Sequence, residues 1–205
     1  MVEGGLENFF ELFLRKDSVF FDKKTLQSAY IPEKIFHRDE QTRQIANVIA
    51  PVLKGDKPSN LFVYGKTGTG KTLTTKHTTL KLMEVSKKEN IPLNVIYINC
   101  KLKRSTDTEY RLIAQLATEL GKSIPPTGLP TEEVYKAFIK ALDRQKQHHI
   151  LVLDEIDQLI HKIGDNILYN LTRINEQTES QISIIGISND IMFVDNLDPR
   201  VRSSL

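Results

Sequence analysis

The sequence is poor in the residues that mark several specialised classes of protein. Its 205 residues include one cysteine, three methionines and no tryptophan. The single cysteine, Cys100, cannot form an intrachain disulfide, so a disulfide-stabilised secreted domain is excluded and a reducing compartment is favoured. Because Cys100 closes the apolar stretch 94–99, we interpret it as a small core residue rather than a reactive thiol.

The net charge is also small, and the chain has no long apolar run. The formal net charge is +2, so overall charge gives no argument for nucleic-acid binding, and any basic patch must be local. No apolar run approaches the roughly 20 residues of a membrane-spanning helix. Glu3, Glu7 and Glu11 interrupt the N-terminal stretch, unlike a secretory signal. We therefore expect a cytoplasmic protein without a membrane partner.

What the chain does contain is an alternation of strand-like and helix-like segments. Its 40% hydrophobic share is enough for a sizeable core in one large α/β domain, alone or with a small appendage. Strands are expected at 60–64, 94–99, 149–153 and 182–187. Helices are expected near 38–54, with a bend at Pro51, and near 71–88, 107–121, 131–146 and 155–178. The alternation predicts a mostly parallel sheet covered by helices on both faces.

The first thirty residues carry an apolar cluster at helical spacing, made by Leu6, Phe9, Phe10, Leu12 and Phe13. A helix with this pattern most often covers an apolar surface of its own protein, and that is our interpretation. Binding of another protein through the same face is the alternative.

A glycine-rich motif with the pattern G-x-x-x-x-G-K-[ST] lies between the first expected strand and the next helix. Its residues are Gly65, Lys66, Thr67, Gly68, Thr69, Gly70, Lys71 and Thr72, followed by Leu73. Glycines let successive backbone N–H groups face a phosphate, and the helix N-terminus adds a positive dipole. Lys71 supplies a charge for the β- and γ-phosphates, and the Thr72 hydroxyl can bind Mg²⁺. A flexible Gly/Thr turn is the alternative, but the strand–loop–helix context predicts a site for ATP or ADP.

Polar residues end two other expected strands. Asp154 and Glu155 follow the apolar run 150–153, and Asn189 follows the last strand. Ligands of an open parallel sheet bind beyond the carboxyl ends of its strands, so we expect these residues near the phosphate loop. Asp154 would then hold Mg²⁺, Glu155 would polarise an attacking water, and Asn189 would contact the γ-phosphate or that water. Helix capping by the acidic pair and a simple turn at Asn189 are the alternatives.

Together these motifs resemble those of AAA+ ATPases, with Walker A at 65–72, Walker B at 150–155 and a sensor-one asparagine at 189. The chain is similar, more closely, to the archaeal replication initiators related to the origin recognition complex and its helicase-loading partner. The stretches that carry this likeness are 19–22 (Val-Phe-Phe-Asp), 30–33 (Tyr-Ile-Pro-Glu), 37–41 (His-Arg-Asp-Glu-Gln), 58–61 (Pro-Ser-Asn-Leu) and 198–205 (Asp-Pro-Arg-Val-Arg-Ser-Ser-Leu).

The resemblance implies further site residues. Residues that wrap the adenine in that family match Tyr30, Ile31, Pro32 and Arg38. An arginine finger acting in trans on a neighbour's nucleotide would be Arg200 or Arg202, although the familiar Ser-Arg-Phe version is not present. The family's DNA-contacting helix corresponds to 101–120, where the basic residues are Lys101, Lys103, Arg104 and Arg111. A solvated helix face is the alternative for this last group.

The resemblance also implies a domain organisation. We expect an N-terminal extension at 1–29 and an AAA+ ATP-binding core at 30–205, a three-layer P-loop sandwich that is truncated before the fifth strand, the helical lid and the winged-helix domain. We therefore expect a fragment of a longer initiator. Without a fifth strand, 60–64 would form an unprotected edge, so we expect part of the sheet to be disordered, rearranged or paired with another chain.

The function implied by the resemblance is that of an ATP-binding replication initiator. It would recognise origin double-stranded DNA, chiefly through the missing domains, and help to load the replicative helicase together with paralogous initiator subunits. Weak, Mg²⁺-dependent ATP hydrolysis would act as a switch, at a nucleoid-associated location. The alternatives are another AAA+ ATPase, such as a clamp loader or transposition ATPase, and a nucleotide-binding oligomerisation module without turnover.

Overall fold

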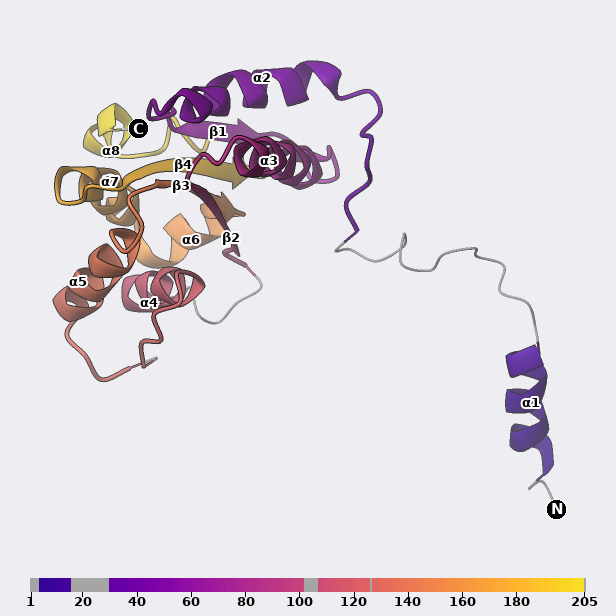
Figure 1. The fold of residues 1–205 in the computed structure, drawn as a ribbon. Helices are drawn as coiled ribbons and strands as arrows, with labels where there is room; N and C mark the ends of the chain where they lie inside the picture. The colour runs from indigo at the N-terminus through magenta and orange to yellow at the C-terminus, as the bar shows by residue number, and fades with distance from the viewer. Residues whose placement is uncertain (1–3, 16–29, 102–106, 126, 205) are drawn as a thin grey trace. The chain divides into compact units, whose positions relative to one another are not determined.

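The computed structural model describes residues 4–15, 30–101, 107–125 and 127–204. The chain divides into two units, residues 1–34 and residues 35–205. The smaller unit contains helix α1 (Gly4–Arg15), and the larger unit contains the other helices and strands (Figure 1). Within the smaller unit, the apolar side chains of α1, from Leu6 to Leu14, are exposed. That α1 covers an apolar surface stays a prediction.

The sheet consists of four parallel strands in the order β1-β4-β3-β2. The strands are β1 (Leu61–Tyr64), β2 (Leu93–Asn99), β3 (His148–Asp154) and β4 (Gln181–Ser188). Each coincides with a segment predicted from the sequence. β3 pairs along its whole length with both neighbours, whereas β1 pairs only with β4 among the described strands. β1 is thus an edge strand of a sheet whose described strands keep a regular register and are not rearranged.

The helices depart from the predicted ranges chiefly in the second half of the larger unit. Those on the first half of the larger unit are α2 (Asp39–Ile49), its 3₁₀ continuation η2 (Ala50–Lys54) and α3 (Lys71–Lys88). The others are α4 (Glu109–Glu119), α5 (Thr131–Leu142), α6 (Ile156–Ile163), α7 (Asn166–Arg173), the 3₁₀ turn η4 (Ile174–Glu176) and α8 (Pro199–Ser204). The change to 3₁₀ geometry falls at Pro51, where a bend was predicted. The predicted helix 155–178 is divided because Gly164 adopts a φ of +81°.

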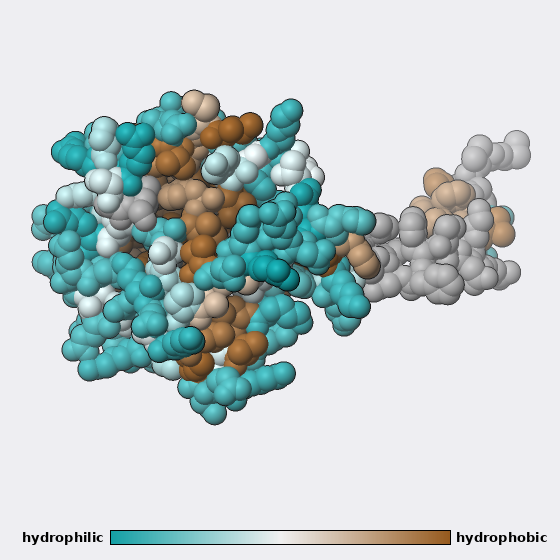
Figure 2. All heavy atoms as spheres, turned by 90° about the horizontal axis from the view of Figure 1, so that it is seen from above, coloured by the Kyte–Doolittle hydropathy of each residue, from teal (hydrophilic) through white to brown (hydrophobic). Residues whose placement is uncertain are grey.

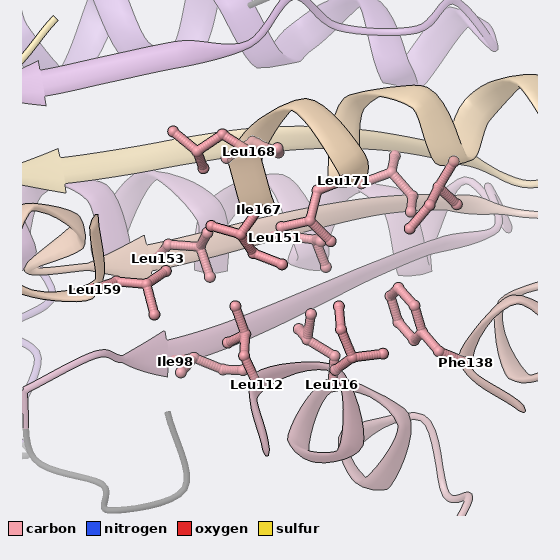
Figure 3. Close-up of a cluster of buried hydrophobic side chains, with 14 of the residues drawn as sticks. Ile98, Leu112, Leu116, Phe138, Leu151, Leu153, Leu159, Ile167, Leu168 and Leu171 are labelled. Atoms are coloured by element: carbon pink, nitrogen blue, oxygen red, sulfur yellow. The ribbon is translucent and has the colours of Figure 1, made fainter. Parts of the chain in front are cut away.

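Helices cover both faces of the sheet and give the larger unit three layers (Figure 1). α2 and α3 pack on one face, through a cluster formed by Ile45, Ile49, Val52, Leu82, Ile150, Val152, Ile185 and Ile187. α4 to α7 pack on the other face through a larger cluster, part of which is drawn in Figure 3. On β3, Leu151 and Leu153 belong to the larger cluster. Because both faces of β3 are buried, residues 150–153 of this strand are all apolar, as predicted.

A glycine permits close packing between β1 and β4. Phe62 and Gly186 are register partners, and a Cβ atom built at Gly186 would lie 2.6 Å from Cε1 of Phe62. Glycine therefore leaves the space that the Phe62 ring occupies. The ring also contacts Phe193, at 5.9 Å between centroids. This packing fixes the strand that leads directly into the glycine-rich loop.

Cys100 is fully buried in the larger cluster, and burial raises the pKa of its thiol to about 12. The interpretation of Cys100 as a core residue is therefore confirmed. On the face of the larger unit seen in Figure 2, apolar residues form a band across an otherwise mainly hydrophilic surface. No helix in the described part of the chain combines the length and apolar character needed to cross a membrane.

Candidate functional site

The glycine-rich loop connects the end of β1 to the start of α3. Gly65, Gly68 and Gly70 have φ angles of +149°, +80° and +83°. Side chains are disfavoured at such angles, so the glycines allow the loop to curl back over the helix N-terminus. The Thr69 hydroxyl donates a hydrogen bond to the carbonyl oxygen of Lys66 at 2.8 Å and closes the loop. The predicted strand–loop–helix arrangement is thus confirmed.

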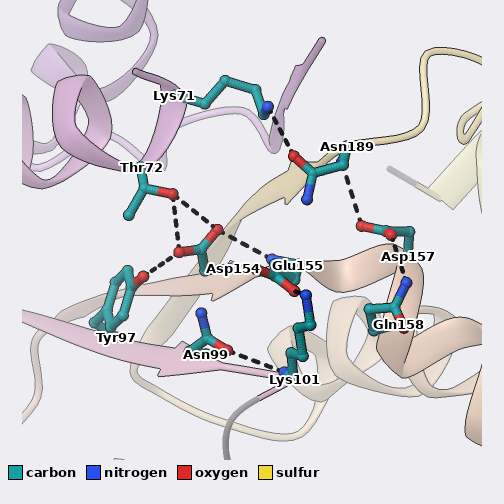
Figure 4. A network of polar contacts seen from close by, with 10 residues as sticks. All are labelled: Lys71, Thr72, Tyr97, Asn99, Lys101, Asp154, Glu155, Asp157, Gln158 and Asn189. Carbon is teal, nitrogen blue, oxygen red and sulfur yellow. Dashed lines mark hydrogen bonds and ion pairs between the residues drawn. The ribbon is translucent and has the colours of Figure 1, made fainter. Parts of the chain in front are cut away.

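Lys71 connects this loop to the end of β4. Its Nζ donates to the carbonyl oxygens of Gly65 and Lys66, at 2.8 and 2.9 Å, and to Oδ1 of Asn189 at 2.9 Å (Figure 4). The ammonium group therefore lies between the loop and the asparagine, 118 residues away in sequence. The structure brings these two predicted residues together.

Asp154 is the meeting point of three hydrogen-bond donors at the end of β3. The Thr72 hydroxyl donates to its Oδ1 and Oδ2, at 3.2 and 3.0 Å, and the Tyr97 hydroxyl donates to Oδ2. The backbone N–H of Glu155 donates to Oδ1 at 3.0 Å. With 3% of its surface exposed, Asp154 is a buried, well-oriented carboxylate beside a hydroxyl (Figure 4).

This donor set fits Mg²⁺ bound together with nucleotide phosphates. Mg²⁺ prefers oxygen ligands and usually takes one or two from protein, with water and phosphate supplying the others. Thr72 and Asp154 provide one hydroxyl and one carboxylate at the foot of the phosphate loop. No cluster of three or more His, Cys, Asp or Glu residues suited to a metal occurs in the described ranges. Thr72 and Asp154 could thus supply two ligands of Mg²⁺, and phosphate and water would supply the others.

Glu155 follows Asp154 in a strained conformation. Its φ and ψ are +55° and +46°, in the left-handed region that non-glycine residues rarely occupy. Its Oε2 lies 3.5 Å from Nζ of Lys101 and accepts no hydrogen bond from the described residues. Strain of this kind concentrates at functional sites. Lys101, predicted to contact DNA, thus forms an ion pair with Glu155, the carboxylate predicted to polarise the attacking water.

Sequence reasoning did not find two residues that hold this group of side chains. Tyr97, on β2, donates to Asp154, and burial together with this hydrogen bond raises the pKa of its phenol. Asp157, on α6, accepts from the backbone N–H of Asn189 at 3.3 Å and is itself bonded by Gln158 at 3.1 Å. Strand alternation gives only a partial signal for Tyr97, because its proximity to Asp154 also requires the register of β2 against β3. Asp157 has no comparable signal.

A cavity of about 280 Å³ adjoins the phosphate loop on the side of α2. Its lining includes Arg38, Gln41, Ile45, Val63, Tyr64, Gly65, Thr69, Lys71 and Thr74. Arg38, predicted to contact the base, therefore lies beside the loop. Larger cavities of about 580 and 490 Å³ share no lining residue with the loop, so volume alone would not identify the site. The expected contacts of Tyr30, Ile31 and Pro32 stay a prediction, because these residues belong to the smaller unit.

The remaining predicted residues lie outside this cluster. Arg200 is 81% exposed on α8 and pairs with Asp198 at 3.3 Å, and Arg202 is also exposed. Arg111 lies in the first turn of α4. Lys103 and Arg104 fall outside the described residues. The roles of these arginines and lysines stay predictions.

Comparisons with known proteins agree with this geometry. A sequence model of the family described as AAA domain matches residues 55–191. The chain is 48% identical to an ORC1-type DNA replication protein of Thermococcus onnurineus over 210 residues, which cover 100% of this chain and 50% of that protein. It is 44% identical to ORC1-type DNA replication protein 1 of Methanosarcina mazei, covering 98% of this chain and 48% of the relative. The chain thus spans about half the length of the curated relatives it matches.

Solved structures show the same fold. The Aeropyrum pernix ORC1 protein in complex with DNA aligns with a TM-score of 0.80 at 40% identity, over 88% of this chain and 46% of that one. The Aeropyrum pernix ORC2 protein in its ADPNP-ADP complexes aligns with a TM-score of 0.77 at 22% identity, over 91% of this chain and 50% of that one. The likeness to archaeal initiators that the motifs predict is therefore confirmed, as is the P-loop fold.

Proposed function

Since the chain belongs to the AAA domain family, we propose that it is the ATP-binding portion of a DNA replication initiator that recognises origins and helps to load the replicative helicase. One observation carries the ATP site: two hydrogen-bonded pairs, Lys71 with Asn189 and Thr72 with Asp154, bring together residues that follow β1, β3 and β4. The initiator role is supported by relatives named ORC1-type DNA replication proteins and by an ORC1 protein solved in complex with DNA.

Each residue of the group has a distinct role in slow ATP hydrolysis. The loop amides and Lys71 hold the β- and γ-phosphates, where developing negative charge needs fixed positive groups. Thr72 and Asp154 hold Mg²⁺, which neutralises phosphate charge when bound. Glu155 accepts a proton from the attacking water, and Asn189 orients that water or the γ-phosphate. Arg38, with Tyr30, Ile31 and Pro32, contacts the adenine.

Residues away from the loop serve partners in this proposal. Arg200 or Arg202 reaches the nucleotide of a neighbouring paralogous subunit, which requires an exposed side chain, and both are exposed. Lys101, Lys103, Arg104 and Arg111 contact duplex DNA by phosphate pairing. Origin binding implies a nucleoid-associated location.

Phosphate release from ATP tests the catalytic part of the proposal. Replacing Glu155 by glutamine keeps the size of the side chain and removes the proton acceptor. We expect Glu155→Gln to retain ATP affinity and to slow phosphate release by about 100-fold. Glu179→Gln is the matched control, because Glu179 is an exposed glutamate that pairs with Lys146. Equal and negligible release from the wild type and Glu155→Gln would instead favour a nucleotide-binding oligomerisation module without turnover.

A further inference from the structure

The register between β2 and β3 places the phenol of Tyr97 beside Asp154, the carboxylate that would bind Mg²⁺. Tyr97 on β2 is the register partner of Val152 on β3, and Asp154 lies two residues further along β3. Alternate residues of a strand share a face, so Tyr97, Val152 and Asp154 all point towards α3. The Tyr97 hydroxyl reaches Oδ2 of Asp154 and donates a hydrogen bond to it (Figure 4).

Helix α3 supports both partners of this hydrogen bond. Thr72 and Lys76 are four residues apart and so lie on one face of α3. The Thr72 hydroxyl contacts the carboxylate of Asp154, and Nζ of Lys76 lies 4.0 Å from the centroid of the Tyr97 ring. An ammonium group at this distance is attracted by the face of an aromatic ring. The orientation of the Tyr97 ring is thereby fixed by the same helix that begins at the phosphate loop.

The distribution of donors shows what Tyr97 contributes. Oδ1 of Asp154 accepts from Thr72 and from the backbone of Glu155, whereas Oδ2 accepts from Thr72 and from Tyr97. A Thr72 hydroxyl that binds a cation presents its oxygen to that cation and can no longer hold both carboxylate oxygens. The donors that do not depend on Thr72 are the N–H of Glu155 on Oδ1 and Tyr97 on Oδ2. Without Tyr97, Oδ2 would lose its donor that is independent of Thr72, and the carboxylate would be less firmly oriented.

We propose that Tyr97 is a positioning residue that orients Asp154 for Mg²⁺ bound with the nucleotide, and that Lys76 holds the Tyr97 ring in place. This inference rests on the proposed nucleotide site. Groups that orient a metal ligand typically change metal affinity by about 10- to 100-fold when they are removed. The effect of Tyr97 should therefore appear in the dependence of nucleotide binding on Mg²⁺, and not in nucleotide binding without the metal.

Calorimetric titration with ADP at a series of Mg²⁺ concentrations, and in the presence of a chelator, tests this role. For Tyr97→Phe we expect the Mg²⁺ concentration that half-saturates the gain in ADP affinity to rise about 10-fold, with metal-free ADP affinity unchanged. Lys76→Met keeps an unbranched chain over the ring without the charge, and it should raise that concentration by a smaller factor. Tyr110→Phe is the matched control, because its hydroxyl donates to the exposed carbonyl of Pro125 at 2.8 Å.

The outcomes separate this inference from the proposed function. An unchanged Mg²⁺ dependence in Tyr97→Phe would overturn the role of Tyr97 while leaving the nucleotide site intact. An equal loss of ADP affinity with and without Mg²⁺, together with a lower unfolding temperature, would also overturn it, by showing a purely structural role. A wild-type protein that binds no ADP under either condition would overturn both the nucleotide site and the inference.

Discussion

The two ends of the proposed nucleotide site are built in different ways. At the phosphate end, all four residues belong to the larger unit, where Lys71 hydrogen-bonds to Asn189 and Thr72 hydrogen-bonds to Asp154. At the base end, a cavity of about 280 Å³ contains Arg38, whereas Tyr30, Ile31 and Pro32 belong to the smaller unit. One end is fixed by the sheet, and the other depends on a segment that precedes it.

This difference teaches which parts of a site the fold itself determines. The carboxyl ends of parallel strands lie at one edge of the sheet, so residues that follow β1, β3 and β4 converge without further contacts. The segment 30–32, which lies between α1 and α2, has no such constraint. Mutations at the phosphate end should therefore affect every ligand that carries the phosphates, and mutations at the base end only ligands that carry the base. ATP and inorganic tripolyphosphate make this comparison measurable.

The largest expected effect is at Lys71. We predict that Lys71→Ala weakens binding of both ATP and tripolyphosphate by about 100-fold, because it removes charge-assisted hydrogen bonds worth about 3 kcal/mol in total. Calorimetric titration measures both affinities. Lys66→Ala is the control, since Lys66 contributes its backbone carbonyl to the loop. Retained binding in Lys71→Ala would contradict the placement of the phosphates.

Sequence reasoning predicts the phosphate end well because strand order, strand ends and motif spacing suffice. These signals predict all four strands, and they place the loop, Asp154 and Asn189 at the ends of strands. Contacts across the sheet are harder, because they require the register as well. Tyr97 meets Asp154 only because β2 pairs with β3 at an offset that the sequence does not contain.

Other features could not be predicted because the same sequence pattern fits more than one local structure. Lys101 lies among basic residues and suggests a DNA contact, yet it pairs with Glu155 because it follows the strand next to β3. Gly164 can occur within a helix, but here its positive φ separates α6 from α7. In these two cases periodicity and composition permit more than one structure.

A second prediction concerns the support beneath the phosphate end. A Cβ at Gly186 would lie 2.6 Å from Cε1 of Phe62 and 3.1 Å from Cδ1 of Ile156. We expect Gly186→Ala to lower the free energy of unfolding by about 2 kcal/mol through overpacking, as measured by urea denaturation. Adding Phe62→Leu should recover part of that loss by opening space. Because β1 leads into the loop, tripolyphosphate affinity should fall too, and unchanged affinity would show that the loop tolerates movement of β1.

A smaller effect is expected at the base end. Arg38 lines the cavity, and its Nε is 3.8 Å from a Cβ built at Gly70. We predict that Arg38→Ala weakens ATP binding about fivefold, as the loss of a guanidinium–ring contact of about 1 kcal/mol would, and leaves tripolyphosphate binding unchanged. Arg43→Ala serves as the control, because Arg43 is an exposed arginine on α2, the helix that begins directly after Arg38. An equal loss for both ligands would assign Arg38 to the phosphate end instead.

The smallest effect concerns the opposite end of β3 from Asp154. His149 is 1% exposed and its Nε2 lies 3.3 Å from the carbonyl oxygen of Leu142, and burial lowers the pKa of the imidazole. Below about pH 6.5, His149 of the unfolded chain takes up a proton, whereas the buried imidazole of the folded protein takes one up less readily. The free energy of unfolding therefore falls as the pH falls. We predict that lowering the pH from 7 to 6 reduces the free energy of unfolding, measured by urea denaturation, by at most about 0.7 kcal/mol through this group. His149→Gln should remove this part of the pH dependence, and an unchanged slope in that variant would assign the dependence to other groups.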